Sequence, residues 1–151
     1  MLTLRKILPD DLPEVVRIEQ SAFADPWPEE AFSKDIMENG YALFDGSRLV
    51  GYTFVLTVLD ECSIINVAVD PEDQNRGHGE HMLRELMKIL TVRKGIRRYF
   101  LDVRESNLPA RSLYRKLGFF ELGIRKNYYN LPPENAVVMG LILPSRRDAV
   151  S

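Results

Sequence analysis

One strand–loop–helix stretch constrains the fold of this chain more than any other. It combines an apolar strand at 67–69, a turn opened by Asp70, a loop that contains Gly77 and Gly79, and an apolar-striped run at 80–90. Glycine has no side chain to hold a ligand away, so the loop backbone can approach an anion closely. A helix that begins after this loop points free N–H groups and its positive dipole end toward the loop. The stretch therefore predicts a binding site for phosphate or pyrophosphate.

Two named phosphate loops differ from the loop sequence Gln74-Asn75-Arg76-Gly77-His78-Gly79. The Walker loop requires a Gly-Lys-Ser/Thr ending, and the dinucleotide loop requires three glycines at set intervals. Neither pattern is present in this stretch. An ordinary glycine-rich turn between a strand and a helix is the alternative interpretation.

Composition and charge exclude several classes of protein. The chain has 151 residues, of which 45% are hydrophobic and 28% are charged, and its net charge is -2. These values are typical of a globular protein, and they predict a single domain at 1–144 followed by a flexible polar tail at 145–151. The net charge gives no electrostatic reason to bind nucleic acid or an anionic membrane.

Two further observations favour a cytoplasmic location. The single cysteine, Cys62, cannot form an internal disulfide, which suits a reducing compartment and an unreactive thiol on a strand. Residues 1–10 lack the apolar core of a signal peptide, and no stretch approaches the ~20 apolar residues of a membrane span.

Hydrophobic spacing predicts an α/β protein. A helix at 80–95 that connects strands at 61–69 and 96–103 through short links is typical of a βαβ unit with parallel neighbouring strands. A helix capped by Ser106 or Asn107 and ended by Gly118 follows. The other expected elements are a strand at 2–7, helices at 10–23 and 28–37, a hairpin of 41–45 with 49–59, and an antiparallel pair of 119–128 with 135–143.

Two residues near the first predicted helix have alternative interpretations. Glu19 falls on the apolar stripe, where a carboxylate at the edge of the core with its head in water is favoured over a substrate role. Trp27 lies between Pro26 and Pro28 in a loop. Its indole either fills the core from a rigid loop or forms one wall of a peptide-binding surface.

His78 and His81 lie three residues apart at the start of the helix that follows the glycine loop. Two imidazoles at this spacing could bind a metal ion, but the pattern supplies no third ligand of suitable type. A solvated helix face is therefore favoured for both residues, and no metal is expected.

Polar residues from separate segments converge at one edge of the predicted sheet. The ligand of an open α/β sheet lies beyond the carboxyl ends of its strands, which here brings Asp70, the glycine loop and Asp102 together. Because Asp102 lies in an apolar strand, it is either a general base or the partner of an arginine such as Arg104 or Arg97. Tyr114 lies on the apolar stripe of the next helix, where it either packs in the core or donates a hydrogen bond to the reacting group.

Two motifs resemble those of the GNAT family of N-acetyltransferases. Residues 74–79 resemble the family's Gln/Arg-x-x-Gly-x-Gly/Ala loop, and residues 107–119 resemble its Asn-x-x-Ala-x-x-Leu-Tyr-x-x-x-Gly-Phe motif. The resemblance extends from the first helix to the last hairpin. It implies the GNAT fold, a mixed central sheet of about six to seven strands with four helices, in which splayed parallel strands hold acetyl-CoA.

The resemblance implies acetyl transfer from acetyl-CoA to an amine. Within the family, the chain is similar to enzymes that acetylate the N-terminal alanine of a small-subunit ribosomal protein, through sequences such as Asp25-Pro26-Trp27 and Arg125-Lys126-Asn127-Tyr128-Tyr129. The implied partner is a protein or peptide N-terminus, with no direct nucleic-acid contact, no membrane and no metal. A lysine side chain, a small-molecule amine and a non-catalytic acetyl-CoA-binding module are the alternatives.

The resemblance also implies residue roles, with Asp102 as general base and Tyr114 as acid. Similar enzymes commonly carry glutamate at the position of Asp102, and the shorter aspartate favours a bridging water. Glu61 is the alternative base because its strand neighbours that of Asp102, and a solvated turn residue is its other interpretation. The implied cofactor-binding residues are Val67, Ala68, Val69, Asp70, Gln74, Arg76, Gly77, His78, Gly79, Glu80, His81 and Asn107. The implied substrate-binding residues are Trp27, Glu61, Tyr128 and Tyr129.

Overall fold

The structure is a computed structural model that describes residues 1–144. The predicted flexible tail at 145–151 lies outside the described residues. The strands are β1 (Leu2–Lys6), β2 (Gly40–Asp45), β3 (Arg48–Val58), β4 (Glu61–Val69), β5 (Arg98–Arg104), β6 (Phe120–Asn130) and β7 (Pro133–Ile142). The α-helices are α1 (Leu12–Ala22), α2 (Lys34–Met37), α3 (His78–Lys94) and α4 (Leu108–Lys116). Short 3-10 turns occur at η1 (Pro9–Asp11), η2 (Glu29–Ala31) and η3 (Pro71–Asp73).

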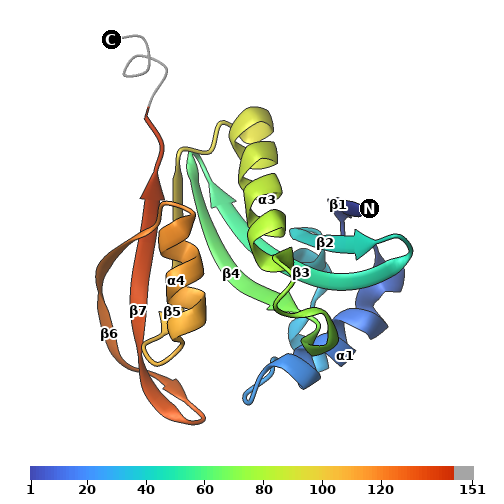
Figure 1. Cartoon of the computed structure of the whole chain (residues 1–151), viewed down its shortest axis with the longest axis horizontal. Coiled ribbons are helices and arrows are strands. Elements are labelled where there is room, and N and C mark those ends of the chain that lie inside the picture. Colours follow the sequence, from blue (N-terminus) through green and yellow to red (C-terminus); the bar gives the residue numbers. More distant parts are fainter. Residues whose placement is uncertain (145–151) are drawn as a thin grey trace. The chain divides into compact units, whose positions relative to one another are not determined.

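The strands of the described residues form one seven-stranded mixed sheet in the order β1-β2-β3-β4-β5-β7-β6 (Figure 1). This architecture confirms the predicted α/β fold with a mixed sheet and four helices. The chain forms two compact units, and the first contains residues 1–56 and 65–86. Among the described residues, the second contains 57–64 and 87–144. The single domain at 1–144 stays a prediction.

In the first unit, β1, β2 and β3 form an antiparallel meander. The turn between β2 and β3 contains Gly46, whose φ is +61°. A Cβ on Gly51 of β3 would lie 2.8 Å from the carbonyl oxygen of Ala68, so the close approach of these backbones requires glycine. The core of this unit is built from buried side chains of α1, β3 and their neighbours, namely Ile7, Val15, Ile18, Phe32, Met37, Ala42, Leu49, Tyr52, Phe54 and Ala68.

In the second unit, β5 pairs in parallel with the start of β4, from Glu61 opposite Arg98 to Ile64 opposite Leu101. This pairing confirms the predicted parallel neighbours. β7 pairs antiparallel with β5 and with β6, and Figure 1 shows β6 and β7 as a long hairpin. The buried Tyr99 joins β5 to the second half of α3, because its hydroxyl is hydrogen-bonded to Thr91.

Cys62 lies in the part of β4 that belongs to the second unit, and its side chain is buried. Burial raises the pKa of its thiol to about 12. A thiol that stays protonated near neutral pH is a poor nucleophile. The structure therefore supports the predicted unreactive cysteine.

Two helices differ from their predicted ranges. The helix predicted at 28–37 is divided into η2 and α2, because the Ser33 hydroxyl accepts the N–H of Ile36 at 3.3 Å and starts a new helical turn. The helix predicted from residue 80 begins two residues earlier, at His78. None of the helices within residues 1–144 is long and apolar enough to cross a membrane.

Candidate active site

The predicted phosphate loop connects β4 to α3 within the first unit. Gly77, immediately before α3, has a φ of +78°, and a Cβ at this position would meet no atom within 4 Å. The N–H of His81 donates to the Gly77 carbonyl at 3.0 Å, which closes the first helical turn. The first N–H groups of an α-helix have no carbonyl of an earlier helical turn to bind. The start of this 17-residue helix is therefore suited to an anion such as a diphosphate.

His78, the first residue of α3, has an exposed fraction of 8%. Both ring nitrogens lack a hydrogen-bond partner among the described residues. The predicted solvated helix face is therefore wrong for His78, because α3 begins early enough to bury this residue. An unpaired buried polar group is unfavourable, and a bound anion would give a ring N–H an acceptor. The site thus fits the diphosphate of the predicted cofactor.

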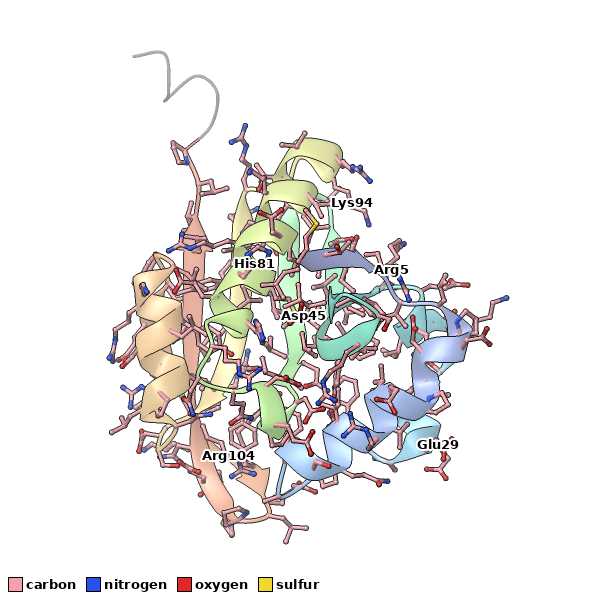
Figure 2. The ribbon with its side chains drawn as sticks, turned by 45° about the vertical axis from the view of Figure 1, so that its right-hand side comes forward. Arg5, Glu29, Asp45, His81, Lys94 and Arg104 are labelled. Atoms are coloured by element: carbon pink, nitrogen blue, oxygen red, sulfur yellow. The ribbon has the colours of Figure 1, made fainter. Side chains whose placement is uncertain are left out.

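The second histidine, His81, lies one turn further along α3 and is half-buried (Figure 2). In residues 1–144, no three side chains of the His, Cys, Asp and Glu types are grouped so that they could hold a metal ion. The described part of the chain therefore supplies no side-chain set that links the histidine pair to a metal site.

An ion-pair network holds the turn that precedes the loop. Asp70 has an exposed fraction of 1%, and its Oδ2 lies 2.7 Å from Nη2 of Arg17 and 3.2 Å from Nη2 of Arg48. Arg48 also pairs with Asp73 at 2.9 Å. Burial opposes ionisation of Asp70, but hydrogen bonds from Arg17 and the Glu72 N–H, with both guanidinium charges, outweigh it and lower its pKa. No local pattern in the sequence singled out Arg17 or Arg48.

Other predicted cofactor-binding residues surround this turn. Gln74 donates its side-chain amide to the carbonyl of Val69 at 3.1 Å, which ties the loop to the end of β4. Arg76 is exposed and lies 3.6 Å from a carboxylate oxygen of Asp73. Val67, Ala68 and Val69 form the last three residues of β4. The structure therefore brings the strand end and the loop together within the first unit.

Glu19 of α1 has an exposed fraction of 2% and accepts three hydrogen bonds. Its Oε1 accepts from the Tyr52 hydroxyl at 2.6 Å and from the Asn66 amide at 2.9 Å. Its Oε2 accepts from the backbone N–H of Trp27 at 2.9 Å. The predicted edge carboxylate with its head in water is therefore wrong, because buried protein donors take the place of water.

The backbone N–H of Trp27 is hydrogen-bonded to Glu19, and its indole ring is packed against other aromatic rings. The indole lies 5.5 Å from the ring of Phe32 and 6.2 Å from that of Phe54, measured between centroids. The side chain is partly buried against the core of the first unit. These contacts support the core-filling interpretation, and a role as a wall for a peptide stays a prediction.

In the second unit, Asp102 lies toward the carboxyl end of β5. Its Oδ1 accepts a hydrogen bond from Nε of Arg125 at 3.2 Å, and the exposed fraction of its side chain is 27%. The structure thus gives Asp102 an arginine partner, which is Arg125 rather than Arg104 or Arg97. Water can still reach the carboxylate, because part of the side chain is exposed.

Three tyrosines gather near Asp102 in this unit. Tyr114 of α4 is buried, packs 5.9 Å from the ring of Phe119, and has its pKa raised to about 12 by burial. Burial, together with the nearby charge of Asp102, raises the pKa of Tyr129 to about 12. Tyr128 makes an edge-to-face contact with Tyr129 at 5.1 Å. The structure therefore brings the predicted residues Asp102, Tyr114, Tyr128 and Tyr129 into one cluster.

Arg104, at the end of β5, fixes the chain beside this cluster (Figure 2). Its guanidinium lies 4.2 Å from the ring centroid of Tyr129. It donates to the carbonyls of Leu131 and Pro132, each at 2.9 Å, and pairs with Glu134 at 3.3 Å. The loop between β6 and β7 is thus tied to β5. The sequence offered Arg104 only as a partner of Asp102, so this positioning contact was missed.

Two remaining predicted residues have other partners. The side-chain oxygen of Asn107 caps α4 by accepting the N–H of Ala110 at 3.2 Å, so its amide nitrogen is the group able to donate to a ligand. Glu61 pairs with Arg98 at 3.0 Å at the start of β4. The parallel register places Glu61 opposite Arg98, four residues or ~13 Å before Asp102 along β5. The structure therefore does not bring Glu61 beside Asp102.

Known proteins resemble this chain over most of its length. A family model described as the acetyltransferase (GNAT) family matches residues 12–119. A putative [ribosomal protein bS18]-alanine N-acetyltransferase of Bacillus subtilis is 38% identical over 141 residues, which cover 90% of this chain and 92% of the relative. The [ribosomal protein bS18]-alanine N-acetyltransferase of Escherichia coli K12 is 37% identical over 145 residues, which cover 93% and 97%.

Solved structures of acetyltransferases are also similar to this chain. The crystal structure of the ribosomal-protein-S18-alanine N-acetyltransferase from Escherichia coli matches with a TM-score of 0.88 and 36% identity, covering 96% of each chain. Arabidopsis thaliana NAA60 in complex with acetyl-CoA shares the fold at 20% identity, with a TM-score of 0.82 and coverage of 94% and 98%. On the strength of the family model and of these full-length relatives, the chain belongs to the GNAT acetyltransferase family.

Proposed function

We propose that this protein is an N-alpha-acetyltransferase that transfers acetyl from acetyl-CoA to the N-terminal alanine of the small-subunit ribosomal protein bS18. Two relatives at 37% and 38% identity are named for this reaction. The structural observation that supports it best is the cluster of Asp102, Tyr114 and Tyr129, in which a carboxylate lies beside one buried and one half-buried phenol. The acting part is a single domain at 1–144, and the cytoplasm is the proposed location.

Acetyl-CoA, when bound, supplies an activated thioester. The backbone of residues 67–70 would hold its pantetheine arm through strand-like hydrogen bonds. The loop residues Gln74, Arg76, Gly77, His78, Gly79, Glu80 and His81 would hold the diphosphate, chiefly through N–H groups at the start of α3. The unpaired ring of His78 supports this assignment, because a phosphate oxygen would accept from it. Asn107 would donate its amide N–H to the pantetheine arm.

Asp102 is the proposed general base for the acceptor amine. An α-ammonium group titrates near ~8 and an ordinary aspartate near ~3.9, so direct proton transfer would be uphill by about 5.5 kcal/mol. Nε of Arg125 donates a hydrogen bond to the carboxylate of Asp102 at 3.2 Å. A water held by Asp102 therefore suits the step better than direct transfer, and the shorter aspartate leaves space for that water. An α-amine is also easier to deprotonate than a lysine at ~10.4, which favours an N-terminal acceptor.

Tyr114 is the proposed hydrogen-bond donor to the departing sulfur of acetyl-CoA. Its pKa is raised to about 12 by burial, so the phenol keeps its proton across the working pH range. Full proton transfer to a thiolate with a pKa near ~8.5 would be uphill by about 5 kcal/mol. Tyr114 therefore stabilises the developing thiolate by a hydrogen bond instead of giving up its proton.

Aromatic side chains are the proposed contacts for the acceptor peptide. Tyr128 and Tyr129 of the second unit and Trp27 of the first each combine an apolar face with a polar group. Glu61 was predicted as a further acceptor contact, and its ion pair with Arg98 favours a structural role instead.

Acceptor peptides with matched N-termini test this function. Peptides that begin with Ala, Ser, Gly or Met are incubated with acetyl-CoA and the protein, and intact mass reports acetylation. We expect the added acetyl group on peptides with a free N-terminal alanine, and none on the same peptide with a blocked N-terminus and an internal lysine. The Asp102→Asn variant is the control for enzyme-dependent transfer.

Two other outcomes would assign a different function. Acetylation of the blocked peptide at its lysine would indicate a lysine acetyltransferase. Tight acetyl-CoA binding without release of free thiol, in the presence of any amine, would indicate a non-catalytic module. The arginine partner of Asp102 is the observation that keeps the second alternative worth testing.

A further inference from the structure

Glu19 is a buried carboxylate that takes no part in the proposed chemistry. Its three donors come from different segments of the first unit: Trp27 from the chain after α1, Tyr52 from β3 and Asn66 from β4. All three donors are neutral. Burial of a charge among neutral donors costs free energy that an apolar side chain would avoid. Packing alone therefore does not account for a carboxylate at this position.

We propose that Glu19 is a positioning residue for the acceptor peptide, and that its carboxylate holds the backbone of Trp27 in the conformation that receives the acceptor. The proposal rests on the proposed function and deepens it, because it names a residue that controls acceptor binding without touching the acceptor. Glu19 acts through Trp27 and through no reacting atom.

The sequence around Trp27 explains why one hydrogen bond can control this segment. Trp27 lies between Pro26 and Pro28, and proline has no backbone N–H. Within the Pro-Trp-Pro sequence, the Trp27 N–H is thus the one backbone donor, and it is given to Glu19 at 2.9 Å. The indole packs on Phe32 and Phe54, so backbone and ring are held by separate contacts.

The two carboxylate oxygens of Glu19 accept hydrogen bonds from different donors. Oε1 accepts from Tyr52 and Asn66, whereas the donor to Oε2 within residues 1–144 is Trp27. A glutamine has one accepting oxygen and one donating NH₂ group. In Glu19→Gln the oxygen would keep Tyr52 and Asn66, and the NH₂ group would face the N–H of Trp27. In this orientation the substitution breaks the link to Trp27 while it preserves side-chain size and the contact with β4.

Steady-state kinetics of Glu19→Gln test the proposal. The matched control is Glu14→Gln, the same chemical change at an exposed position of α1. We expect the KM of Glu19→Gln for an alanine-starting peptide to rise about tenfold, while its kcat and its KM for acetyl-CoA stay within about twofold of the wild type. Glu14→Gln should match the wild type. An unchanged peptide KM in Glu19→Gln, or an equal rise in the KM for acetyl-CoA, would overturn the proposal.

Trp27 is the single tryptophan of the chain, so its fluorescence reports on this segment alone. Acrylamide should quench the emission of Glu19→Gln more strongly than that of the wild type and of Glu14→Gln, and equal quenching would overturn the proposal. This measurement does not depend on acetyl transfer. If the wild type acetylates no peptide, the proposed function fails, and the quenching comparison still decides whether Glu19 holds Trp27.

A measurement on the wild type covers the case in which Glu19→Gln does not fold. Labelling with ¹⁵N-tryptophan gives one backbone amide signal, that of Trp27. We expect this amide to exchange with solvent at least about tenfold more slowly than in an unstructured peptide, because it is hydrogen-bonded to a buried carboxylate. Exchange at the unstructured rate would overturn the proposal.

Discussion

The guanidinium of Arg17 lies 2.7 Å from the carboxylate of Asp70, although the two residues are 53 positions apart in the chain. Arg17 belongs to α1, and Asp70 follows β4 directly at the start of the turn before the glycine loop at 74–79. Arg48 approaches the same carboxylate at 3.2 Å. Two guanidinium groups thus face the buried carboxylate of Asp70, and Arg48 also pairs with the buried carboxylate of Asp73.

Replacement of Arg17 by alanine should lower the free energy of unfolding by about 2 kcal/mol, because the buried Asp70 then keeps Arg48 as its remaining cation. The KM for acetyl-CoA should rise, since the turn before the loop is less well fixed. Urea denaturation and steady-state kinetics measure the two effects. Glu14→Gln removes the other partner of Arg17, an exposed carboxylate, and should cost less than about 0.5 kcal/mol. Equal losses in the two variants would contradict the role of Asp70.

Asp70 should also make the stability of the protein depend on acid pH. Its pKa is lower in the folded than in the unfolded chain, so the folded state binds fewer protons. Its contribution to stability is therefore complete above the unfolded value of ~3.9 and is lost as the pH falls through the lower folded value. Denaturation of the wild type and Asp70→Asn between pH 2 and pH 6, about the range of this titration, should show a flatter pH dependence for the variant. Parallel curves would show that Asp70 does not contribute.

Local features of the sequence were sufficient to predict a glycine loop followed by a helix, and the phosphate-binding role of this loop stays a prediction. Gly77 and the helix that begins at His78 are adjacent in the chain, so their geometry follows from glycine's positive φ and from helix formation. The burial of His78 and Glu19 was not predictable in the same way. Helical spacing shows which face of a helix a residue occupies, but the donors that surround Glu19 come from other segments.

The partner of Asp102 depends on strand register, which a single sequence does not give. Asp102 of β5 pairs with Val138 of β7, and Arg125 of β6 pairs with Ala136 of β7. The ion pair therefore joins β5 to β6, and it depends on the register of both strands with β7. The register between β6 and β7 also shifts between Glu121 and Gly123. A shift of one residue would turn side chains to the other face, so the arginine that meets Asp102 becomes known only from the structure.

Replacement of Asp102 by asparagine should lower kcat by about 10²-fold or more, because the amide cannot accept a proton from the amine or from a relay water. Asp102→Glu should retain activity within about tenfold, since the carboxylate that accepts the proton is kept. Both variants should keep the wild-type melting temperature, because the side chain is partly exposed. A kcat for Asp102→Asn equal to that of the wild type would remove Asp102 from the mechanism.

Replacement of Arg104 by lysine should raise the KM for the acceptor peptide by about fivefold, with little change in the KM for acetyl-CoA. Lysine keeps the charge but cannot stack on Tyr129 and reach the carbonyls of Leu131 and Pro132 together. Peptide titrations at saturating acetyl-CoA measure the effect. Arg97→Lys serves as the control, because Arg97 donates to the carbonyl of Pro144 instead of the tyrosine cluster. Equal peptide KM values for the two variants would contradict the role of Arg104.

Because Tyr114 stays protonated, the kcat of the enzyme should be constant over a broad alkaline pH range. Burial raises the pKa of its phenol to about 12, so the hydrogen-bond donor persists through the alkaline range and kcat should stay level from about pH 9 to pH 11. Tyr114→Phe should lower kcat by about tenfold or more at every pH on this plateau. A fall of wild-type kcat with a midpoint near pH ~10, absent from Tyr114→Phe, would show that Tyr114 ionises as an ordinary tyrosine.

The stability of the protein should depend on the ionisation of Tyr114 in the opposite sense to that of Asp70, because stability is lost here as the pH rises. A pKa raised from ~10 in the unfolded chain to about 12 in the folded chain means that folding favours the protonated phenol. Its contribution is complete below the unfolded pKa and is lost as the pH rises toward 12. The free energy of unfolding should therefore fall more steeply on this alkaline side for the wild type than for Tyr114→Phe. Identical slopes would mean that burial does not hold the proton on Tyr114, and the hydrogen bond proposed for the departing sulfur would lose its basis.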